Sequence, residues 1–196
     1  IRLFKYNPGQ GAPGEIEATF VARERVLKGI MQDLRERSRS ASNQHYLIIG
    51  PRGIGKTNLP LTINQHVLKE EALASAYLPV QTAEEEYSIT GLRDLLTRVL
   101  ELILQANPED PMKEARQSIN GMADDEKAAE AAVSALREIS KKNSKKILLL
   151  MDNLDLVLGD QFTDEAQVGR LRDLLMNDSF LVLVGGAPTY FREVRG

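Results

Sequence analysis

The alternation of apolar and polar positions predicts strands and helices in turn. Short apolar runs predict strands at about 46–49, 76–80, 147–151 and 180–184. Apolar residues at helical spacing predict helices, which cover about 21–38, 56–69, 92–103, 125–142 and 164–176. Because helices separate the strands along the chain, the strands should lie parallel, with helices on both faces of the sheet. We therefore expect an α/β fold with three layers.

Two segments interrupt this alternation. Residues 1–17 include several prolines and glycines, and we expect an irregular N-terminal lead-in before a core domain at 18–196. Residues 106–124 contain two prolines, one glycine and weak periodicity, which predicts a mobile surface insertion. The chain starts at Ile1 without a methionine and stops at Gly196 soon after a predicted strand. We therefore expect a fragment of a longer protein.

Composition narrows the class of protein. The chain has 196 residues, of which 42% are hydrophobic and 27% charged, as in ordinary globular proteins. Its net charge of −3 gives no overall attraction to nucleic acid or to an anionic membrane. The absence of cysteine excludes disulfides and thiolate metal sites. Because no apolar run approaches the ~20 residues of a membrane span, we expect a cytoplasmic protein without a membrane partner.

The segment after the first predicted strand carries the strongest functional signal. It matches G-x-x-x-x-G-K-[ST] at every fixed position. A glycine-rich turn brings backbone N–H groups close to a polyphosphate, and the N-terminus of the following helix favours an anion. Lys56 can reach the β- and γ-phosphates, the Thr57 hydroxyl can ligate Mg²⁺, and Arg52 either lines the phosphates or faces water. The predicted nucleotide-binding residues here are Gly50, Pro51, Arg52, Gly53, Ile54, Gly55, Lys56, Thr57 and Asn58.

An acidic residue supplies the second half of this site. The apolar run 147–151 ends at Asp152, whose carboxylate should lie beside the phosphates and hold Mg²⁺ through its water shell. Many ATPases of this build have a Glu at the next position, whereas this chain has Asn153, which can orient water but cannot accept its proton. Asp155 could substitute from a different angle. The sequence therefore argues more strongly for nucleotide binding than for fast turnover, and we expect an ATPase whose hydrolysis is slow.

Two other features each allow two interpretations. Gly185 and Gly186 follow the last predicted strand and leave Thr189 as the candidate sensor of the γ-phosphate, although a simple glycine turn fits equally. The predicted catalytic set is thus Lys56, Asp152, Asn153, Asp155 and Thr189. The basic run 141–146 closes a predicted helix, where lysines meet the negative end of the dipole. Contact of this run with nucleic acid is the less favoured interpretation.

Three blocks, in this order, resemble the AAA+/STAND group of P-loop ATPases. They are Phe20-Val21-Ala22-Arg23-Glu24, the loop at 50–57 and the LLLMDNLD segment at 148–155. The first block of that group reads F-V-G-R-E, and its backbone packs against adenine. The resemblance thus implies nucleotide contacts for Phe20, Val21 and Arg23, with Ala22 in place of the glycine. More narrowly, the chain resembles the N-terminal ATPase module of large bacterial multidomain proteins.

The resemblance also implies a fold and a function. The fold is the three-layer P-loop NTPase of AAA+/ASCE type with a sheet ordered 5-1-4-3-2, so we expect the fifth strand and the helical lid beyond Gly196. The cofactors are ATP or ADP and Mg²⁺. The function is a nucleotide-gated switch that controls assembly or signalling through self-association, attached domains or partner proteins.

Two other functions compete with the switch. The first is a DNA-acting AAA+ ATPase of the initiator or transposition-regulator type, but no basic DNA-binding element is evident in the sequence. The second is a scaffold with a vestigial nucleotide site, which the intact Lys56, Thr57 and Asp152 disfavour.

Overall fold

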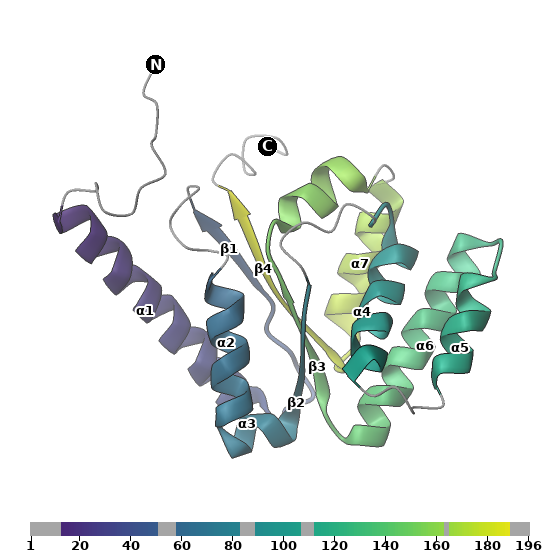
Figure 1. Cartoon of the computed structure of the whole chain (residues 1–196), viewed down its shortest axis with the longest axis horizontal. Helices are drawn as coiled ribbons and strands as arrows, with labels where there is room; N and C mark the ends of the chain where they lie inside the picture. Colours follow the sequence, from purple (N-terminus) through teal and green to yellow (C-terminus); the bar gives the residue numbers. More distant parts are fainter. Residues whose placement is uncertain (1–12, 51–57, 83–88, 107–111, 163–164, 189–196) are drawn as a thin grey trace.

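The computed structural model of the chain describes residues 13–50, 58–82, 89–106, 112–162 and 165–188 (Figure 1). Its centre is a four-stranded parallel sheet in the order β1-β4-β3-β2. The strands are β1 (Tyr46–Gly50), β2 (Tyr77–Gln81), β3 (Lys146–Met151) and β4 (Leu181–Pro188). The four predicted strands and their parallel direction are confirmed. The order also agrees with the 1-4-3-2 part of the implied sheet.

Helices cover both faces of this sheet, as expected for three layers (Figure 1). One face carries α1 (Pro13–Arg37), α2 (Asn58–Lys69) and α3 (Glu71–Ala76). The other carries α4 (Leu92–Ala106), α6 (Asp125–Asn143) and α7 (Glu165–Asn177), with α5 (Met112–Asn120) packed against α4 and α6. A short π-helix, η1 (Leu156–Gln161), follows β3. Among the described helices, none is long and apolar enough to cross a membrane.

The central strands explain why the sheet needs both helical layers. Every residue from Ile147 to Met151 in β3 is at most 2% exposed. Leu148 and Leu150 pack on the side of α1 and α2, whereas Ile147 and Leu149 pack on the side of α4 and α6. A strand covered on both faces reads as a continuous apolar run. The run KILLLM is therefore a direct consequence of its central place in the sheet.

The first helix is longer than the periodicity predicts. It begins at Pro13, so the expectation of an irregular lead-in to residue 17 was wrong for residues 13–17. A proline suits the first position of a helix, because the missing N–H would have no partner there and its φ is already helical. Pro13 is thus a starting signal for the helix rather than a sign of irregular structure. Residues 1–12 lie outside the described part of the chain.

The expected insertion at 106–124 is also partly wrong, because residues 112–120 form α5. Ile119 is 2% exposed against α4 and α6. The guanidinium of Arg116 donates to Glu101 of α4 at 2.7 Å. The guanidinium of Arg93 donates to the carbonyls of Ile119 and Asn120 at 3.2 and 3.1 Å. These hydrogen bonds provide partners for carbonyls at the C-terminal end of α5. Tertiary contacts stabilise a segment whose own periodicity is weak.

Candidate nucleotide-binding site

The candidate site lies where β1, β4 and β3 end at the same edge of the sheet. β1 ends at Gly50, which pairs with Pro188 of β4, and Met151 of β3 pairs with Gly185 of β4. Since neighbouring strands lie about 4.8 Å apart, the strand that leads into the glycine-rich loop and the strand that carries Asp152 are separated by ~10 Å. This is a suitable span for a phosphate chain and a metal ion between them.

Some predicted residues of the site lie outside the described part of the chain. These are Pro51, Arg52, Gly53, Ile54, Gly55, Lys56, Thr57 and Thr189. Gly50 is the buried last residue of β1, and Asn58 is the first described residue of α2, so the described elements on either side of the loop are a strand and a helix, as predicted. The backbone of Phe20, Val21 and Arg23 belongs to α1, whereas their side chains are not described.

Asp152 follows β3 directly and has an unusual polar environment. Its Oδ1 atom accepts the backbone N–H of Asn153 at 2.9 Å. Its Oδ2 atom is buried and has no hydrogen-bond partner among the described residues. A buried carboxylate oxygen without a donor is costly and needs an explanation. A hydrated Mg²⁺ would supply both positive charge and water donors, so this residue fits the predicted metal role.

Asn153 turns the chain sharply away from the sheet. Its φ is +50°, in the left-handed region, where asparagine is tolerated better than longer side chains. Its carbonyl accepts the N–H of Leu156 at 3.0 Å. The turn leaves Asn153 half-buried, whereas Asp155 is only 7% exposed. Asparagine at this position therefore also suits the backbone, which a glutamate would fit less well.

Gly185 is a residue of the site that the sequence analysis assigned to a turn. It lies within β4, which runs past the predicted end at Val184. A Cβ atom on Gly185 would lie 2.4 Å from Cδ2 and 3.2 Å from Cβ of Leu154. Leu154, at 3% exposure, thus packs directly on the backbone of β4 and holds the turn after Asp152 in place. The paired glycines in an apolar run were the available signal, because they mark close approach of another group.

Thr82 is a second residue that sequence reasoning missed. It follows β2, and its N–H donates to the carbonyl of Leu150 at 3.1 Å, which places it beside the end of β3. It is 6% exposed, and its hydroxyl has no hydrogen-bond partner in the described structure. The Thr82 hydroxyl and Oδ2 of Asp152 are thus both buried at this edge of the sheet without a hydrogen-bond partner among the described residues.

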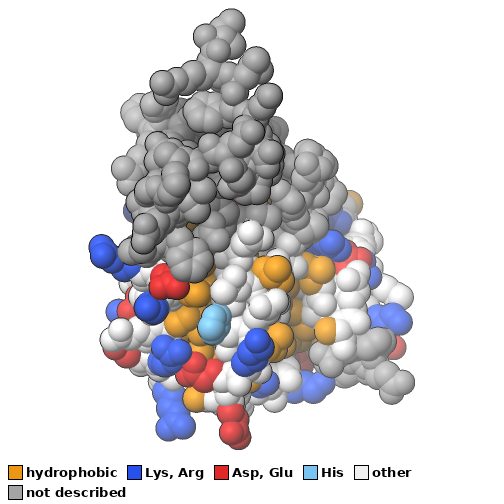
Figure 2. Space-filling model, turned by 60° about the vertical axis from the view of Figure 1, so that its left-hand side comes forward, with side chains coloured by type: hydrophobic (Ala, Val, Ile, Leu, Met, Phe, Trp, Pro, Cys, Tyr) orange, Lys and Arg blue, Asp and Glu red, His pale blue; other side chains and the backbone are white. Residues whose placement is uncertain are grey.

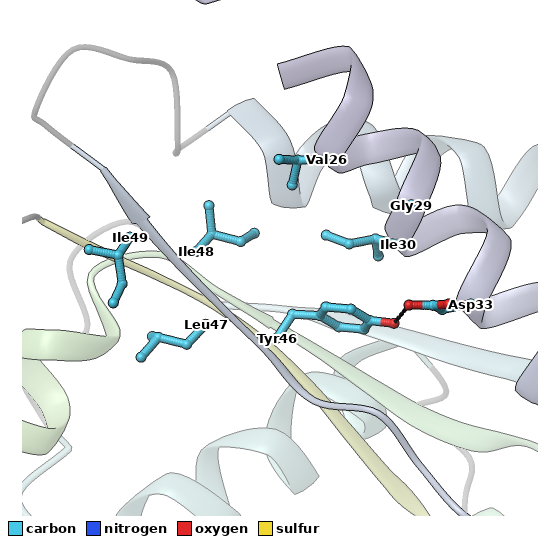
Figure 3. A pocket seen from close by; sticks show the side chains of 8 residues that line it. All are labelled: Val26, Gly29, Ile30, Asp33, Tyr46, Leu47, Ile48 and Ile49. Atoms are coloured by element: carbon cyan, nitrogen blue, oxygen red, sulfur yellow. Dashed lines mark hydrogen bonds between the residues drawn. The ribbon is translucent and has the colours of Figure 1, made fainter. Parts of the chain in front are cut away.

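A separate groove of ≈ 440 Å³ lies between α1 and β1 (Figure 3). The hydroxyl of Tyr46 donates to Oδ2 of Asp33 at 2.6 Å across it. Burial, helped by this carboxylate, raises the pKa of Tyr46. The groove follows β1 from Tyr46 to Ile49, the residue before Gly50. It is lined by Val26, Gly29, Ile30, Asp33, Tyr46, Leu47, Ile48 and Ile49.

Two solved structures resemble this chain at low sequence identity. ORC2 of Aeropyrum pernix, solved as ADPNP–ADP complexes, superposes with a TM-score of 0.54 at 15% identity and covers 87% of this chain and 43% of its own. PCH-2 of C. elegans gives a TM-score of 0.48 at 12% identity, over 85% of this chain and 37% of its own. The chain thus spans less than half the length of either protein. No curated protein matches it in sequence.

The likeness to ORC2 supports the fold, a three-layer P-loop NTPase of AAA+ type. The model of the AAA ATPase domain matches residues 19–184, which include the FVARE block, the glycine-rich loop and Asp152. The chain therefore belongs to the AAA ATPase domain family.

Proposed function

We propose that this chain is an ATP-binding switch module that hydrolyses ATP slowly. The observation that carries the proposal is Asp152, whose buried Oδ2 lacks a hydrogen-bond partner among the described residues at the end of β3. The sheet places this carboxylate two strands from Gly50, where the loop G-x-x-x-x-G-K-T begins. A phosphate-bound Mg²⁺ is the group that both features accommodate.

Different residues would bind the phosphates, the Mg²⁺ ion and the adenine. The backbone of 50–57 would surround the phosphates, Lys56 would neutralise the β- and γ-phosphates, and the first turn of the helix would face the anion. Thr57 and Asp152 would hold Mg²⁺, which neutralises phosphate charge when bound. The FVARE block, with Phe20, Val21 and Arg23, would contact adenine.

Slow hydrolysis follows from the turn after Asp152. The amide of Asn153 can orient a water molecule, but it cannot take the proton that an attacking water releases. Apart from Asp152, Asp155 is the nearest carboxylate in the sequence, and its burial at 7% exposure limits its access to that water. Asp155 therefore serves better as an internal support of the turn than as a general base. Thr189 remains a candidate for sensing the γ-phosphate.

Slow hydrolysis suits a switch, because an ATP-bound state that persists can be recognised by other parts of a protein. The output would pass to attached domains, partner proteins or further copies of the chain. A cytoplasmic bacterial protein of the STAND type is the setting we propose. The turn 152–161 connects the metal position to α7 and provides one route for such coupling.

The test is calorimetric titration of Mg²⁺·ATP into the protein and its Asp152→Asn variant. We expect at least tenfold weaker binding by the variant, which equals ~1.4 kcal/mol. Without nucleotide, the variant should be as stable as the parent or more stable, because it removes an uncompensated buried charge. Equal affinity for Mg²⁺·ATP would contradict the assigned role, and no binding by the parent would favour the vestigial scaffold.

Turnover distinguishes the switch from an ordinary ATPase. We expect steady-state hydrolysis by the parent to be well below the ~10 s⁻¹ that is typical of enzymes. Asn153→Glu should raise it if the missing base limits the rate, at some cost to stability from the left-handed backbone. Sustained fast hydrolysis by the unmodified protein would contradict the proposal of a slow switch, but not the proposal that the chain binds ATP.

The DNA-acting ATPase remains the second candidate. One observation favours it: within the described residues, Arg37, Arg39, Lys141 and Lys145 form no ion pair at the opposite edge of the sheet.

A further inference from the structure

Positively charged side chains gather at the N-terminal edge of the sheet, away from the nucleotide site. The end of α1 and the turn after it contribute Arg37 and Arg39, and the end of α6 with its following turn contributes Lys141 and Lys145. We call these four residues the basic surface. The basic run 141–146 supplies only half of it, and the other half comes from a distant part of the sequence.

Lys146 holds the two halves together. Its Nζ atom donates to the carbonyls of Arg37 and Ser40 at 2.9 and 2.7 Å, and to Oδ1 of Asn43 at 2.8 Å. The Asn43 amide donates in turn to the carbonyl of Leu181 at 2.9 Å. The turn after α1 is thus tied to the first residues of β3 and β4. The backbone that carries Arg37 and Arg39 has a defined position beside the lysines.

The turn after α6 is also well defined. Ser144 has a φ of +51° and its N–H donates to the carbonyls at the end of the helix, as in a common C-terminal cap. The hydroxyl of Ser140 donates to the carbonyl of Lys145 at 2.6 Å, and the N–H of Lys145 donates back to the carbonyl of Ser140 at 3.1 Å. Lys141 and Lys145 therefore project from a fixed backbone.

Direct ion pairs do not neutralise the basic surface within the described residues. In the part of the chain that is described, Arg37, Arg39, Lys141 and Lys145 form no ion pair. Six other arginines do pair with carboxylates, namely Arg35, Arg93, Arg98, Arg116, Arg137 and Arg170. The three oxygens that accept from Lys146 are neutral. Desolvation, and after it the charge of Arg37, lowers the pKa of Lys146, as expected where positive charge is in excess.

We propose that the basic surface binds the phosphate backbone of nucleic acid without reading its base sequence. Cations spread over two neighbouring turns suit a chain of phosphates better than a single anion. Two aromatic residues at this edge of the sheet, Tyr77 and Phe180, are 2% and 5% exposed and cannot stack on bases. This surface lies at the opposite end of the strands from Asp152, so nucleotide and nucleic acid can bind together.

An anionic membrane is the less suitable partner. Surfaces that bind membranes combine basic side chains with exposed large apolar ones. The exposed large hydrophobic residues of the described structure lie outside the two turns; they are Val26, Leu47, Leu61, Leu68 and Met176.

The test measures fluorescence anisotropy of a short labelled DNA duplex with the whole chain, without nucleotide, over a series of salt concentrations. The variant Arg39→Gln/Lys145→Gln removes two contacts and should lower the slope of log K against log salt by about 1.8, or ~0.9 for each phosphate contact. Its affinity at low salt should fall about tenfold or more. The charge-preserving Arg39→Lys/Lys145→Arg should bind like the parent.

The matched control is Lys113→Gln/Arg172→Gln, which makes the same charge change at exposed positions of α5 and α7. It should keep the salt slope of the parent, and equal urea midpoints should show that both variants are folded. A loss as large in the control would show that net charge alone matters and would overturn the proposal. No binding of the duplex at low salt, or binding to phosphatidylserine vesicles in its place, would also overturn it. Because no nucleotide is present, the result is independent of the ATP proposal.

Discussion

The two edges of the sheet differ in whether their buried polar groups have hydrogen-bond partners. At the N-terminal edge, Lys146 and Asn43 use their side-chain donors fully, and both ring nitrogens of His45 have partners. At the C-terminal edge, Asp152 and Thr82 keep buried oxygens that lack partners in the described structure. Satisfied buried networks fix a fold, whereas unsatisfied groups are tolerated where a ligand completes them. We call the first edge the structural end, with the basic surface on its exterior, and the second the binding end, where we propose that the nucleotide binds.

Lys146→Met should have the largest effect on stability and should act at the structural end. It removes three hydrogen bonds from a charged donor and leaves the carbonyls of Arg37 and Ser40 without that partner. We expect a loss of ~3 kcal/mol in the free energy of unfolding, measured by urea denaturation. Lys145→Met is the control and should stay within about 0.5 kcal/mol. Similar losses for both variants would show that the network contributes little.

Gly185→Ala tests the binding end. The new methyl group would overlap Leu154 and displace the turn that carries Asp152. We expect a loss of ~1–3 kcal/mol in stability together with weaker Mg²⁺·ATP binding. Gly169→Ala in α7 is the matched control, because nothing lies within 4 Å of the added atom. It should stabilise the protein by about 0.5–1 kcal/mol. A tolerated alanine at Gly185 would mean that the contact with Leu154 does not position the turn.

The smallest expected effect is the pH dependence from His45. Its Nδ1 atom accepts the N–H of Leu183 at 3.1 Å, so Nε2 donates to the carbonyl of Leu175 at 2.7 Å. This arrangement requires the neutral ring, and burial lowers the pKa of His45 below its usual 6.5. The unfolded chain therefore takes up the proton first, so the contribution of His45 is complete above pH 6.5 and is lost as the pH falls below it.

Urea midpoints at neutral and mildly acidic pH measure this contribution. His45→Gln should flatten the pH dependence, whereas His66→Gln, at an exposed position of α2, should leave it unchanged. An unchanged slope in His45→Gln would show that other groups govern acid sensitivity in this range.

The sequence predicts the layers of the molecule well because their signals are local. The run 147–151 shows a strand covered on both faces, and the loop motif with Asp152 locates the candidate site. What escaped prediction depends on contacts between distant residues. The helix α5 forms because Arg93, Arg116 and Ile119 find partners on neighbouring helices. The left-handed φ of Asn153 and the contact between Gly185 and Leu154 likewise depend on how the turn packs against β4.

The basic surface is another feature that could not be predicted from the sequence. The lysines of 141–146 are visible in the sequence as the end of a helix, and there the dipole explains them. Arg37 and Arg39 come near them in the fold, where Lys146 donates to the carbonyls of Arg37 and Ser40. Proximity of like charges from separate segments has no sequence signature, and the fold is needed to reveal it.

The place of β4 has a consequence for how this module can move. Because β4 bonds to both β1 and β3, two rows of backbone hydrogen bonds fix the distance from Gly50 to Asp152. The sheet is rigid in this direction, since stretching it would break several backbone hydrogen bonds at once. If the chain is the switch that we propose, exchange of ATP for ADP would leave that spacing unchanged. The signal would then depend on rotation of the segments that leave the sheet, beginning with the turn at Asn153.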